Sequence, residues 1–144
     1  ISLRYFTVYG PRQRPDMGIN KFVYSILEGK EIVIFGDGTQ TRDFTYIDDI
    51  VDGILLALEK TNGYQIFNLG NNKPVELEYF ISCIEKEIGK SAKKKYMELQ
   101  PGDVLETFAD ISHTTEILGW EPKTSTEEAI KAFIGWYNEY YGDK

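Results

Sequence analysis

The chain has 144 residues, of which 42% are hydrophobic and 27% charged, a composition typical of a folded domain with its own core. Its formal net charge of −7 argues against general binding to nucleic acid or anionic membranes, and no apolar run approaches the roughly 20 residues of a membrane helix. Cys83 is the only cysteine, which excludes an internal disulfide framework and favours a reducing, cytoplasmic location.

The four arginines lie in the first third of the chain, whereas every later cation is a lysine. They are Arg4, Arg12, Arg14 and Arg42. A guanidinium group is planar and binds carboxylate and phosphate groups through two parallel hydrogen bonds. The clustering is therefore compatible with a site for a small anionic ligand. Chance clustering of four residues explains it equally well, so composition alone leaves both interpretations open.

In the first third, aromatic and β-branched residues at 3–9 predict a buried strand that ends at Gly10-Pro11. Asp16 is positioned to cap a helix with apolar residues at positions 19, 22, 23, 26 and 27, and Gly29 is expected to end that helix. Residues 32–35 predict another short strand. Because a strand is expected at the very first residues and no initiator methionine precedes it, we expect the chain to be truncated at its N-terminus.

The rest of the chain alternates between helices and strands. Apolar periodicity predicts helices over residues 47–58, 77–88 and 112–118 and a last helix that opens at Ser125, with strands at 64–69 and 94–99. Thr45 with Asp48, and Ser125 with Glu128, have the spacing of capping boxes. Strands that alternate with helices indicate an α/β fold.

The stretch 35–49 combines a Gly-rich turn with a short strand. Gly36 and Gly38 allow a tight turn and a close approach of the backbone to a ligand, because glycine tolerates positive φ. Hydroxyl and amide groups follow at 39–41, and Arg42 then supplies a cationic fork suited to phosphate or carboxylate. The stretch therefore predicts a turn that closes around an anion.

Two patterns that suggest other chemistry are rejected on their context. Gly36-x-Gly38 has two glycines of a dinucleotide fingerprint, but the third is absent and a strand, not a helix, is expected to follow. His113 is the only histidine, which argues against a catalytic triad or a histidine metal cluster.

Three acids and the cysteine are assigned structural roles. Asp48, Asp49 and Asp52 stand at the start of a predicted helix, where carboxylates favour the helix dipole and usually form a solvated face rather than a metal site. Cys83 lies on the core-facing stripe of another helix and is expected to pack there. The sequence thus predicts no metal site and no complete catalytic apparatus in this chain.

Motifs distributed over essentially the whole chain carry a resemblance to a known family. In chain order they are LRYFTVYGPRQRPDM at 3–17, IFGDGTQTRDFTYIDDIVDGI at 34–54, FNLGNN at 67–72, QPGDV at 100–104 and ADISHTTEILGWEPKTSTEEAIKAFIGWY at 109–137. Together they resemble the C-terminal part of extended short-chain dehydrogenase/reductase nucleotide-sugar epimerases. FTVYGPRQRPD and QPGDV are most similar to the UDP-glucuronate 4-epimerase branch.

The resemblance implies that residues 1–144 are the C-terminal substrate-binding part of such an enzyme, a small α/β unit with late strands of a Rossmann-type sheet near 3–9 and 65–69. The N-terminal NAD-binding part, with its Gly-rich loop, Ser/Thr and Tyr-x-x-x-Lys pair, is expected to be absent. NAD would be bound mainly by that part, so no catalytic residue is assigned here and the cofactor-binding residues are unknown. Tyr140 and Lys144 have the spacing of the pair, but chance explains it better at the C-terminus with no partner serine.

Three roles at the sugar and base follow from the resemblance. Thr7, at the end of the first strand, would contact the sugar, and Arg14 would pair with the C6 carboxylate of a glucuronate. Phe35 would pack on the uracil. Gln100 stands where galactose epimerases have an arginine that makes a second phosphate contact, which favours the uronate branch over UDP-galactose.

The roles at the diphosphate and ribose follow in the same way. Arg42 would bind the diphosphate, and Asp103 would form a hydrogen bond with the ribose. Gln40 is expected to form a polar wall of the site, without a specific role.

For the complete protein the resemblance implies transient oxidation of the sugar at C4 by NAD, with a tyrosine taking the hydroxyl proton, and hydride return to the other face. One alternative is a non-catalytic nucleotide-sugar binding module, which the lack of catalytic residues in this chain favours. Another is the substrate half of a related UDP-sugar decarboxylase or dehydratase, because the residues that set the chemistry would lie upstream.

The expected partner is a UDP-sugar, with no nucleic acid and no membrane. The complete protein is expected to be a homodimer. In the isolated chain, the strands at 3–9 and 65–69 would lack the parallel neighbours of a complete sheet. Because exposed strand edges favour association, we expect the isolated chain to self-associate.

Overall fold

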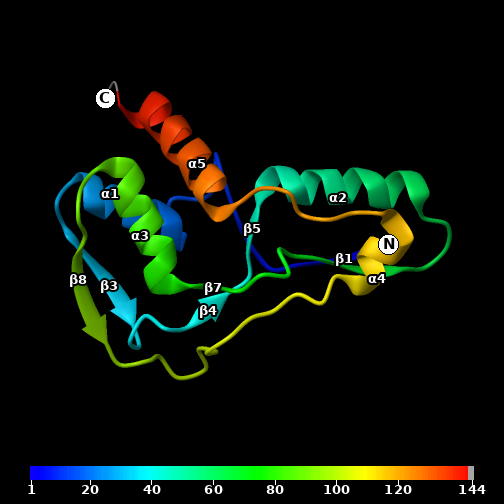
Figure 1. The fold of residues 1–144 in the computed structure, drawn as a ribbon, viewed down its shortest axis with the longest axis horizontal. Coiled ribbons are helices and arrows are strands. Elements are labelled where there is room, and N and C mark those ends of the chain that lie inside the picture. The colour runs from blue at the N-terminus through cyan, green and yellow to red at the C-terminus, as the bar shows by residue number, and fades with distance from the viewer. Residues whose placement is uncertain (143–144) are drawn as a thin grey trace.

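A computed structural model describes residues 1–142 and shows α/β alternation along the chain (Figure 1). Its helices are α1 (Gly18–Leu27), α2 (Ile47–Lys60), α3 (Leu77–Ile88), α4 (Ser112–Leu118) and α5 (Thr126–Tyr141). Its strands are β1 (Ser2–Tyr5), β2 (Thr7–Tyr9), β3 (Glu31–Phe35), β4 (Thr41–Arg42), β5 (Phe44–Tyr46), β6 (Ile66–Leu69), β7 (Val75–Glu76) and β8 (Lys93–Met97). Within the described residues, no helix is long and apolar enough to cross a bilayer.

The strands form pairs rather than one broad sheet within residues 1–142. β1 pairs with β6, β2 with β5 and β3 with β8, all in parallel, while β4 and β7 are antiparallel. Parallel pairs require crossover segments. The segment between β1 and β6 contains α2, that between β2 and β5 contains α1, and that between β3 and β8 contains α3.

The single buried strand predicted at 3–9 is wrong in two respects. The strand breaks at Phe6 into β1 and β2, and these two pieces pair with different partners. β1 is also largely exposed, with Tyr5 half exposed. β1 has a neighbour on one edge only among the described residues, and only Leu3 of this strand packs against a hydrophobic core.

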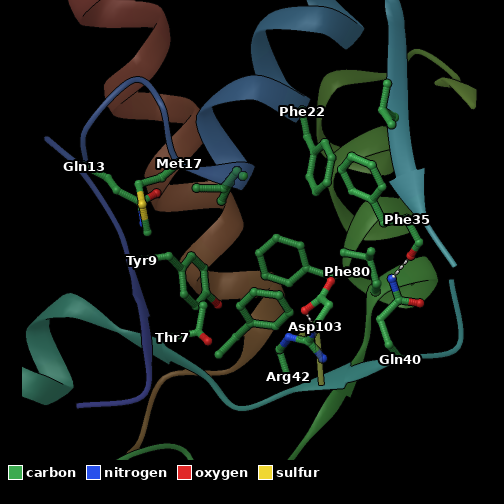
Figure 2. A pocket seen from close by; sticks show the side chains of 15 residues that line it. Thr7, Tyr9, Gln13, Met17, Phe22, Phe35, Gln40, Arg42, Phe80 and Asp103 are labelled. Atoms are coloured by element: carbon green, nitrogen blue, oxygen red, sulfur yellow. Dashed lines mark hydrogen bonds and ion pairs between the residues drawn. The ribbon is translucent and has the colours of Figure 1, made fainter. Parts of the chain in front are cut away.

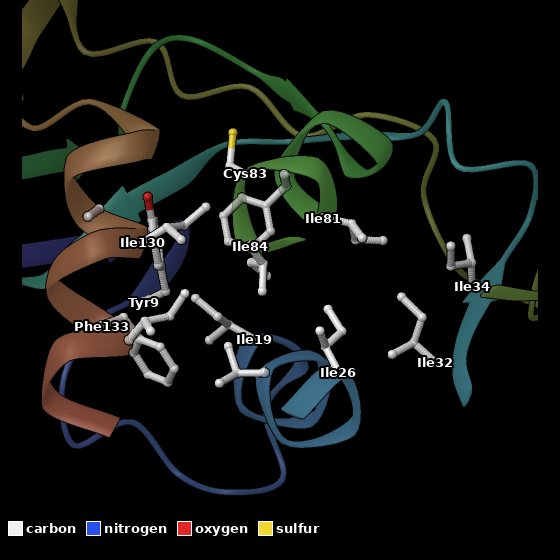
Figure 3. Close-up of a cluster of buried hydrophobic side chains, with 14 residues drawn as sticks. Tyr9, Ile19, Ile26, Ile32, Ile34, Ile81, Cys83, Ile84, Ile130 and Phe133 are labelled. Carbon is white, nitrogen blue, oxygen red and sulfur yellow. The ribbon is translucent and has the colours of Figure 1, made fainter. Parts of the chain in front are cut away.

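The first hydrophobic core joins three helices to strands β2 and β3. Figure 3 shows side chains from α1, α3 and α5 converging beside Ile32 and Ile34 of β3. Phe80 and Phe133 are among its largest fully buried side chains. Cys83 lies in the same core as a free thiol, which confirms its predicted packing role. This core holds α1, β3 and α3 in fixed relation at one end of the molecule (Figure 1).

The second core lies at the other end, between α2, α4 and β6 (Figure 1). Trp120 is buried there, and its indole N–H donates to the Asp49 carbonyl over 2.9 Å. The Asp49 carboxylate accepts from the backbone N–H groups of Lys123 and Thr124, each over 3.1 Å. The solvated role predicted for Asp49 is therefore wrong: this acid is buried and ties the chain before α5 to the start of α2.

The helix ends agree with the sequence patterns at some termini and not at others. The Ser125–Glu128 capping box is confirmed, and Gly89 ends α3 in the left-handed conformation with φ 73°. The cap predicted at Asp16 is wrong, because α1 begins after Met17 and the Asp16 carboxylate pairs with Arg14 instead.

The capping box predicted for Thr45 and Asp48 is also wrong. α2 begins after Tyr46 with no side-chain cap, and the Thr45 hydroxyl donates to the carboxylate of Asp43 over 3.1 Å. Thr45 therefore serves a different part of the structure, because a buried acceptor lies within its reach.

Asp43 is fully buried and joins three segments of the chain. Oδ1 accepts from the Asn71 N–H over 2.5 Å and from the Thr45 hydroxyl. Oδ2 accepts from the N–H groups of Asn72 over 3.0 Å and of Ala109 over 2.9 Å. Such an arrangement stabilises a buried carboxylate, because hydrogen bonds replace the lost water.

Replacement of Asp43 by Ala should lower the free energy of unfolding by roughly 3 kcal/mol, because three backbone N–H groups, of which that of Ala109 is buried, would each lose a charged acceptor. Urea denaturation followed by circular dichroism would measure the loss. Asp52→Ala is the matched control, since Asp52 is an exposed acid of α2, and its effect should stay within about 0.5 kcal/mol. Equal losses in the two variants would contradict the role assigned to Asp43.

Candidate functional site

A cavity of about 250 Å³ opens between β2, α1, β3, β4 and the segment around residue 103 (Figure 2). Five of the six predicted substrate residues line it: Thr7, Phe35, Gln40, Arg42 and Asp103. Small-molecule sites usually enclose roughly 300–1,000 Å³, so this cavity can enclose part of a nucleotide sugar. The tertiary structure thus brings together residues that lie as far apart as the first and last thirds of the chain.

The apolar wall of the cavity was not predicted from the sequence. Phe44 and Phe80 stack with ring centroids 4.1 Å apart, and Tyr9 meets Phe80 edge-on at 5.3 Å. Phe22 of α1 also lines the cavity. In the sequence, these apolar residues have the same spacing as residues that face a hydrophobic core. Only the tertiary structure shows that they line a cavity.

Tyr9 is a hydrogen-bonding phenol rather than an acid or base in this site. Burial, followed by the nearby Cys83, raises the pKa of the Tyr9 phenol well above its ordinary value, against a weaker opposing effect of a hydrogen bond with Thr126. The phenol therefore stays neutral at physiological pH.

The Gly-rich turn has the predicted conformation, with φ 84° at Gly36 and 86° at Gly38. Gln40 holds this turn from inside: its amide nitrogen donates to the Phe35 carbonyl over 2.5 Å, and its amide oxygen accepts from the Gly38 N–H over 3.0 Å. Gln40 is itself buried. Gln40 therefore lines the cavity, and its two hydrogen bonds also fix the direction in which the chain leaves Phe35.

Arg42 reaches across the cavity to the segment that contains Asp103. Its Nη2 pairs with Asp103 Oδ1 over 2.8 Å, and Nη1 donates to the carbonyls of Thr41 over 2.9 Å and Leu105 over 3.4 Å. The Arg42 side chain is only 18% exposed. A guanidinium group has five N–H donors, so donors remain for an anionic ligand beside those that hold the arginine in place.

Arg14 is the one predicted substrate residue that the structure leaves outside the cavity lining. Its side chain is 74% exposed and pairs with Asp16 over 2.9 Å. It borders a neighbouring cavity, with Trp136 and Tyr141 on the other wall. Gln13 lines both cavities, so Arg14 lies next to the site but not in it.

The remaining residues considered from the sequence lie away from the cavity. The His113 ring stacks on Phe67, with Nε2 3.2 Å from the Gln65 amide oxygen. Within residues 1–142, no group of three or more His, Cys, Asp or Glu side chains is arranged to hold a metal ion. Lys144 of the Tyr-x-x-x-Lys spacing lies outside the described residues.

Comparison with known proteins finds relatives that match nearly the whole chain. Residues 1–70 match the NAD dependent epimerase/dehydratase family. A UDP-glucuronate 4-epimerase of Thermodesulfobacterium geofontis is 51% identical over 138 residues, which cover 95% of this chain and 42% of that protein. An uncharacterized protein of Methanocaldococcus jannaschii is 55% identical over 139 residues, covering 96% of this chain and 43% of the relative.

Among solved structures, the UDP-glucuronic acid 4-epimerase of Bacillus cereus, in complex with UDP-glucuronic acid and NAD, superposes with a TM-score of 0.91 at 43% identity. The match covers 96% of this chain and 45% of that chain. The resemblance to the nucleotide-sugar epimerases is confirmed. The predicted α/β fold class is confirmed with it, since the chain superposes on these epimerases and its strands form parallel pairs. The chain spans less than half the length of these relatives.

The Gly-rich turn does not suit the NAD of this epimerase family. It leads into strand β4 rather than into a helix, so it lacks the row of free N–H groups that a helix N-terminus presents to a pyrophosphate. The Gly38 N–H is already bonded to Gln40. No residue of this turn is therefore assigned to NAD. The assignment of residues 1–144 to the substrate-binding part of a longer protein stays a prediction.

Gly38 of this turn and Gly102 of the separate turn at 100–103 form a matched pair of glycines for mutation. A Cβ atom at Gly38 would lie 2.6 Å from Glu78 Cγ, whereas one at Gly102 would meet nothing within 4 Å, and both residues have φ near +86°. Gly102→Ala should lose roughly 1–2 kcal/mol of unfolding free energy through backbone strain alone. Gly38→Ala should lose about 1–3 kcal/mol more through the clash, as measured by urea denaturation. Equal losses would show that Glu78 moves aside without cost.

Proposed function

We propose that this chain is the UDP-sugar binding part of an NAD-dependent nucleotide-sugar 4-epimerase that acts on UDP-glucuronate. The observation that carries the proposal is the cavity in which Phe35, Arg42, Asp103 and Thr7 face one another. Similarity to UDP-glucuronate 4-epimerases over at least 95% of the chain supports the choice of ligand.

In this proposal the diphosphate binds Arg42. The guanidinium is already oriented by two carbonyl groups and by Asp103, so little side-chain freedom is lost when an anion arrives. A charge-assisted hydrogen bond of this kind contributes about 1.5–3 kcal/mol. The phosphate binds the guanidinium N–H groups that remain beside the pair with Asp103 Oδ1, and the second carboxylate oxygen of Asp103 accepts from a ribose hydroxyl.

The base would lie against Phe35, at the end of β3 where the Gly-rich turn begins. Base–aromatic stacking contributes about 1–3 kcal/mol per base. The Gln40 amide holds the carbonyl of Phe35, so the strand end is rigid where the base would contact it. This arrangement anchors the nucleotide at one end and leaves the sugar at the Thr7 end free to turn.

The chemical step is assigned to groups outside this chain. NAD, when bound by the complete protein, supplies hydride transfer to and from C4. The part played by residues 1–142 is to hold UDP while the sugar presents either face, which requires firm contacts on the nucleotide and few on the sugar ring.

We place the complete protein in the cytoplasm as a homodimer. The free, buried Cys83 supports a reducing compartment, and UDP-sugars are the proposed partner. The single-edged pairing of β1 with β6 within the described residues supports self-association of the isolated chain. Light scattering of the purified chain checks this part of the proposal.

Two alternatives remain within the same fold. A non-catalytic UDP-sugar binding module would bind UDP without NAD, and a related decarboxylase or dehydratase would share the cavity. The upstream coding sequence discriminates between the non-catalytic module and an enzyme: an enzyme requires a Gly-rich loop and a Tyr-x-x-x-Lys pair there. Product analysis with UDP-glucuronate then separates epimerisation from loss of carbon dioxide or water.

Arg42→Ala should weaken UDP binding by about 10- to 150-fold, because one charge-assisted contact to the diphosphate is lost. Isothermal titration calorimetry of the chain with UDP measures the change. Arg4→Ala is the control: Arg4 is an exposed arginine of β1 that does not line the cavity, and its removal should leave the affinity within about two-fold. Unchanged affinity in Arg42→Ala would contradict the assigned role.

Arg14→Ala in the complete protein should reduce kcat/KM strongly for UDP-glucuronate and weakly for a neutral UDP-sugar. The physical reason is that Arg14 would pair with the C6 carboxylate, after leaving its exposed and therefore weak contact with Asp16. Steady-state kinetics with the two substrates measures the ratio. Equal losses with both would remove Arg14 from the carboxylate site.

A further inference from the structure

Lys94 occupies a position of β8 where a hydrophobic side chain would be expected. In the parallel pair of β3 and β8, Lys94 lies beside Ile32, and Tyr96 lies beside Ile34. Both isoleucines are buried in the first core, and residues side by side on neighbouring strands point to the same face of the sheet. A lysine on the core-facing side of a strand is unfavourable unless its charge is paired, so this lysine requires partners.

Two carboxylates of α3 supply those partners. Lys94 Nζ pairs with Glu78 Oε2 over 2.7 Å and with Glu85 Oε2 over 3.7 Å. The Tyr96 hydroxyl donates to the other carboxylate oxygen of Glu78, Oε1, over 2.5 Å. The side chains of Lys94 and Glu85 are 22% exposed and that of Glu78 is 31% exposed, so solvent screens these charges less than those of a fully exposed pair.

Glu78 is ionised in this cluster at neutral pH. Partial burial raises the pKa of its carboxyl group, but the hydrogen bonds from Lys94 and Tyr96 and the charge of Lys94 outweigh that effect and lower the pKa overall. Each carboxylate oxygen of Glu78 thus accepts from a different side chain of β8. The carboxylate therefore fixes β8 against the first turn of α3.

The same residue supports the Gly-rich turn that follows Phe35. The Glu78 N–H donates to the Gly38 carbonyl over 3.1 Å. A Cβ atom at Gly38 would lie 2.6 Å from Glu78 Cγ and 2.9 Å from Glu78 Oε1, so the Glu78 side chain fills the space beside this glycine. The close approach that Gly38 permits is therefore made by Glu78 rather than by a ligand.

The strands on either side of this contact lead to groups of the proposed UDP site. β3 ends at Phe35, and β8 continues into the segment that contains Asp103. The two strand ends are bonded to each other, since the Gly36 N–H donates to the Met97 carbonyl over 2.8 Å. Glu78 itself does not line the cavity, so it can affect a ligand only through these segments.

We propose that Glu78 is a positioning residue for the UDP site. Through its contacts with β8 and with the Gly-rich turn, it holds Phe35 and Asp103 in the arrangement that a nucleotide requires. The inference rests on the proposed function and extends it to a residue behind the cavity wall. A protein in which the fitting arrangement is populated one-tenth of the time binds its ligand about tenfold more weakly, so contacts that fix the wall before binding increase affinity.

The test is the affinity for UDP, measured by isothermal titration calorimetry on the unaltered chain and on Glu78→Gln. Glutamine keeps the length of the side chain and an acceptor for Tyr96, but it removes the charge that pairs with Lys94. We expect the affinity to fall about 3- to 30-fold, because fewer molecules have the fitting arrangement. Ser125→Ala is the matched control. It removes the capping box of α5 and so lowers stability, but the affinity should stay within about two-fold.

A second substitution tests whether Glu78 acts through Lys94. Lys94→Met keeps an apolar stem at the core-facing position and should weaken UDP binding by a similar factor. In the double variant, the loss should be no larger than in the weaker-binding single variant, since both changes break the same ion pair. Losses that multiply in the double variant would contradict this route. Lys94→Met also provides the comparison with the unaltered chain if Glu78→Gln does not fold.

Nuclear magnetic resonance of the chain without ligand supplies a readout that a general loss of stability does not move. The backbone amide signals of Gly36, Gly38 and Asp103 should shift in Glu78→Gln and stay in place in Ser125→Ala. Unchanged signals in Glu78→Gln would show that Glu78 does not set the position of these segments.

The outcomes separate this inference from the proposed function. If the unaltered chain binds UDP and Glu78→Gln binds it equally well, Glu78 does not position the site, and the inference is wrong while the proposed function stands. The same holds if Ser125→Ala loses as much affinity as Glu78→Gln. If the unaltered chain does not bind UDP, the proposed function fails and the inference fails with it.

Discussion

The geometry of the cavity depends on the buried carboxylate of Asp43. Besides the four donors on its side chain, its backbone N–H donates to the Thr107 hydroxyl over 2.9 Å, and its carbonyl accepts from the Thr7 N–H over 3.1 Å. Its sequence neighbours Arg42 and Phe44 both face the cavity. One residue thus ties β2 and the segment after Asp103 to the strand that carries the arginine, so the ligand-facing side chains are held by hydrogen bonds made directly behind them.

The cavity lies at the border of the first hydrophobic core. Its walls are therefore held by core packing, while its mouth stays open to a ligand. Phe80 belongs to that core and to the cavity wall at once, so packing that stabilises the fold also shapes the pocket. The polar groups come from loops and strand ends: the turn after Phe35, the loop around Gln13 and the segment around Asp103. Loops positioned by a packed scaffold are where binding groups are usually found.

Although the chain as a whole is acidic, two of its arginines are proposed to bind the ligand, and they lie in different surroundings. Arg42 and Arg14 each pair with an aspartate at close to the same distance, but their surroundings differ. Arg42 is largely buried and bonded to two backbone carbonyls, whereas Arg14 is mostly exposed. An exposed pair contributes little and opens readily, while the buried guanidinium is held in one orientation. The first arrangement suits a fixed anchor for a diphosphate, and the second suits a side chain that moves toward its ligand.

The sequence by itself determined the features that depend on near neighbours. The capping box of Ser125 and Glu128 and the positive φ of Gly36 and Gly38 each involve residues within a few positions. Five of the residues that the family motifs single out line one cavity. Only the tertiary structure decided the burial of Asp43 and Asp49, the break in the first strand and the ion pair of Lys94 with Glu78. Each of these depends on the segment that supplies the hydrogen-bond donor or packs over the residue, and that segment is often dozens of residues away. Patterns over a few neighbouring residues do not identify it.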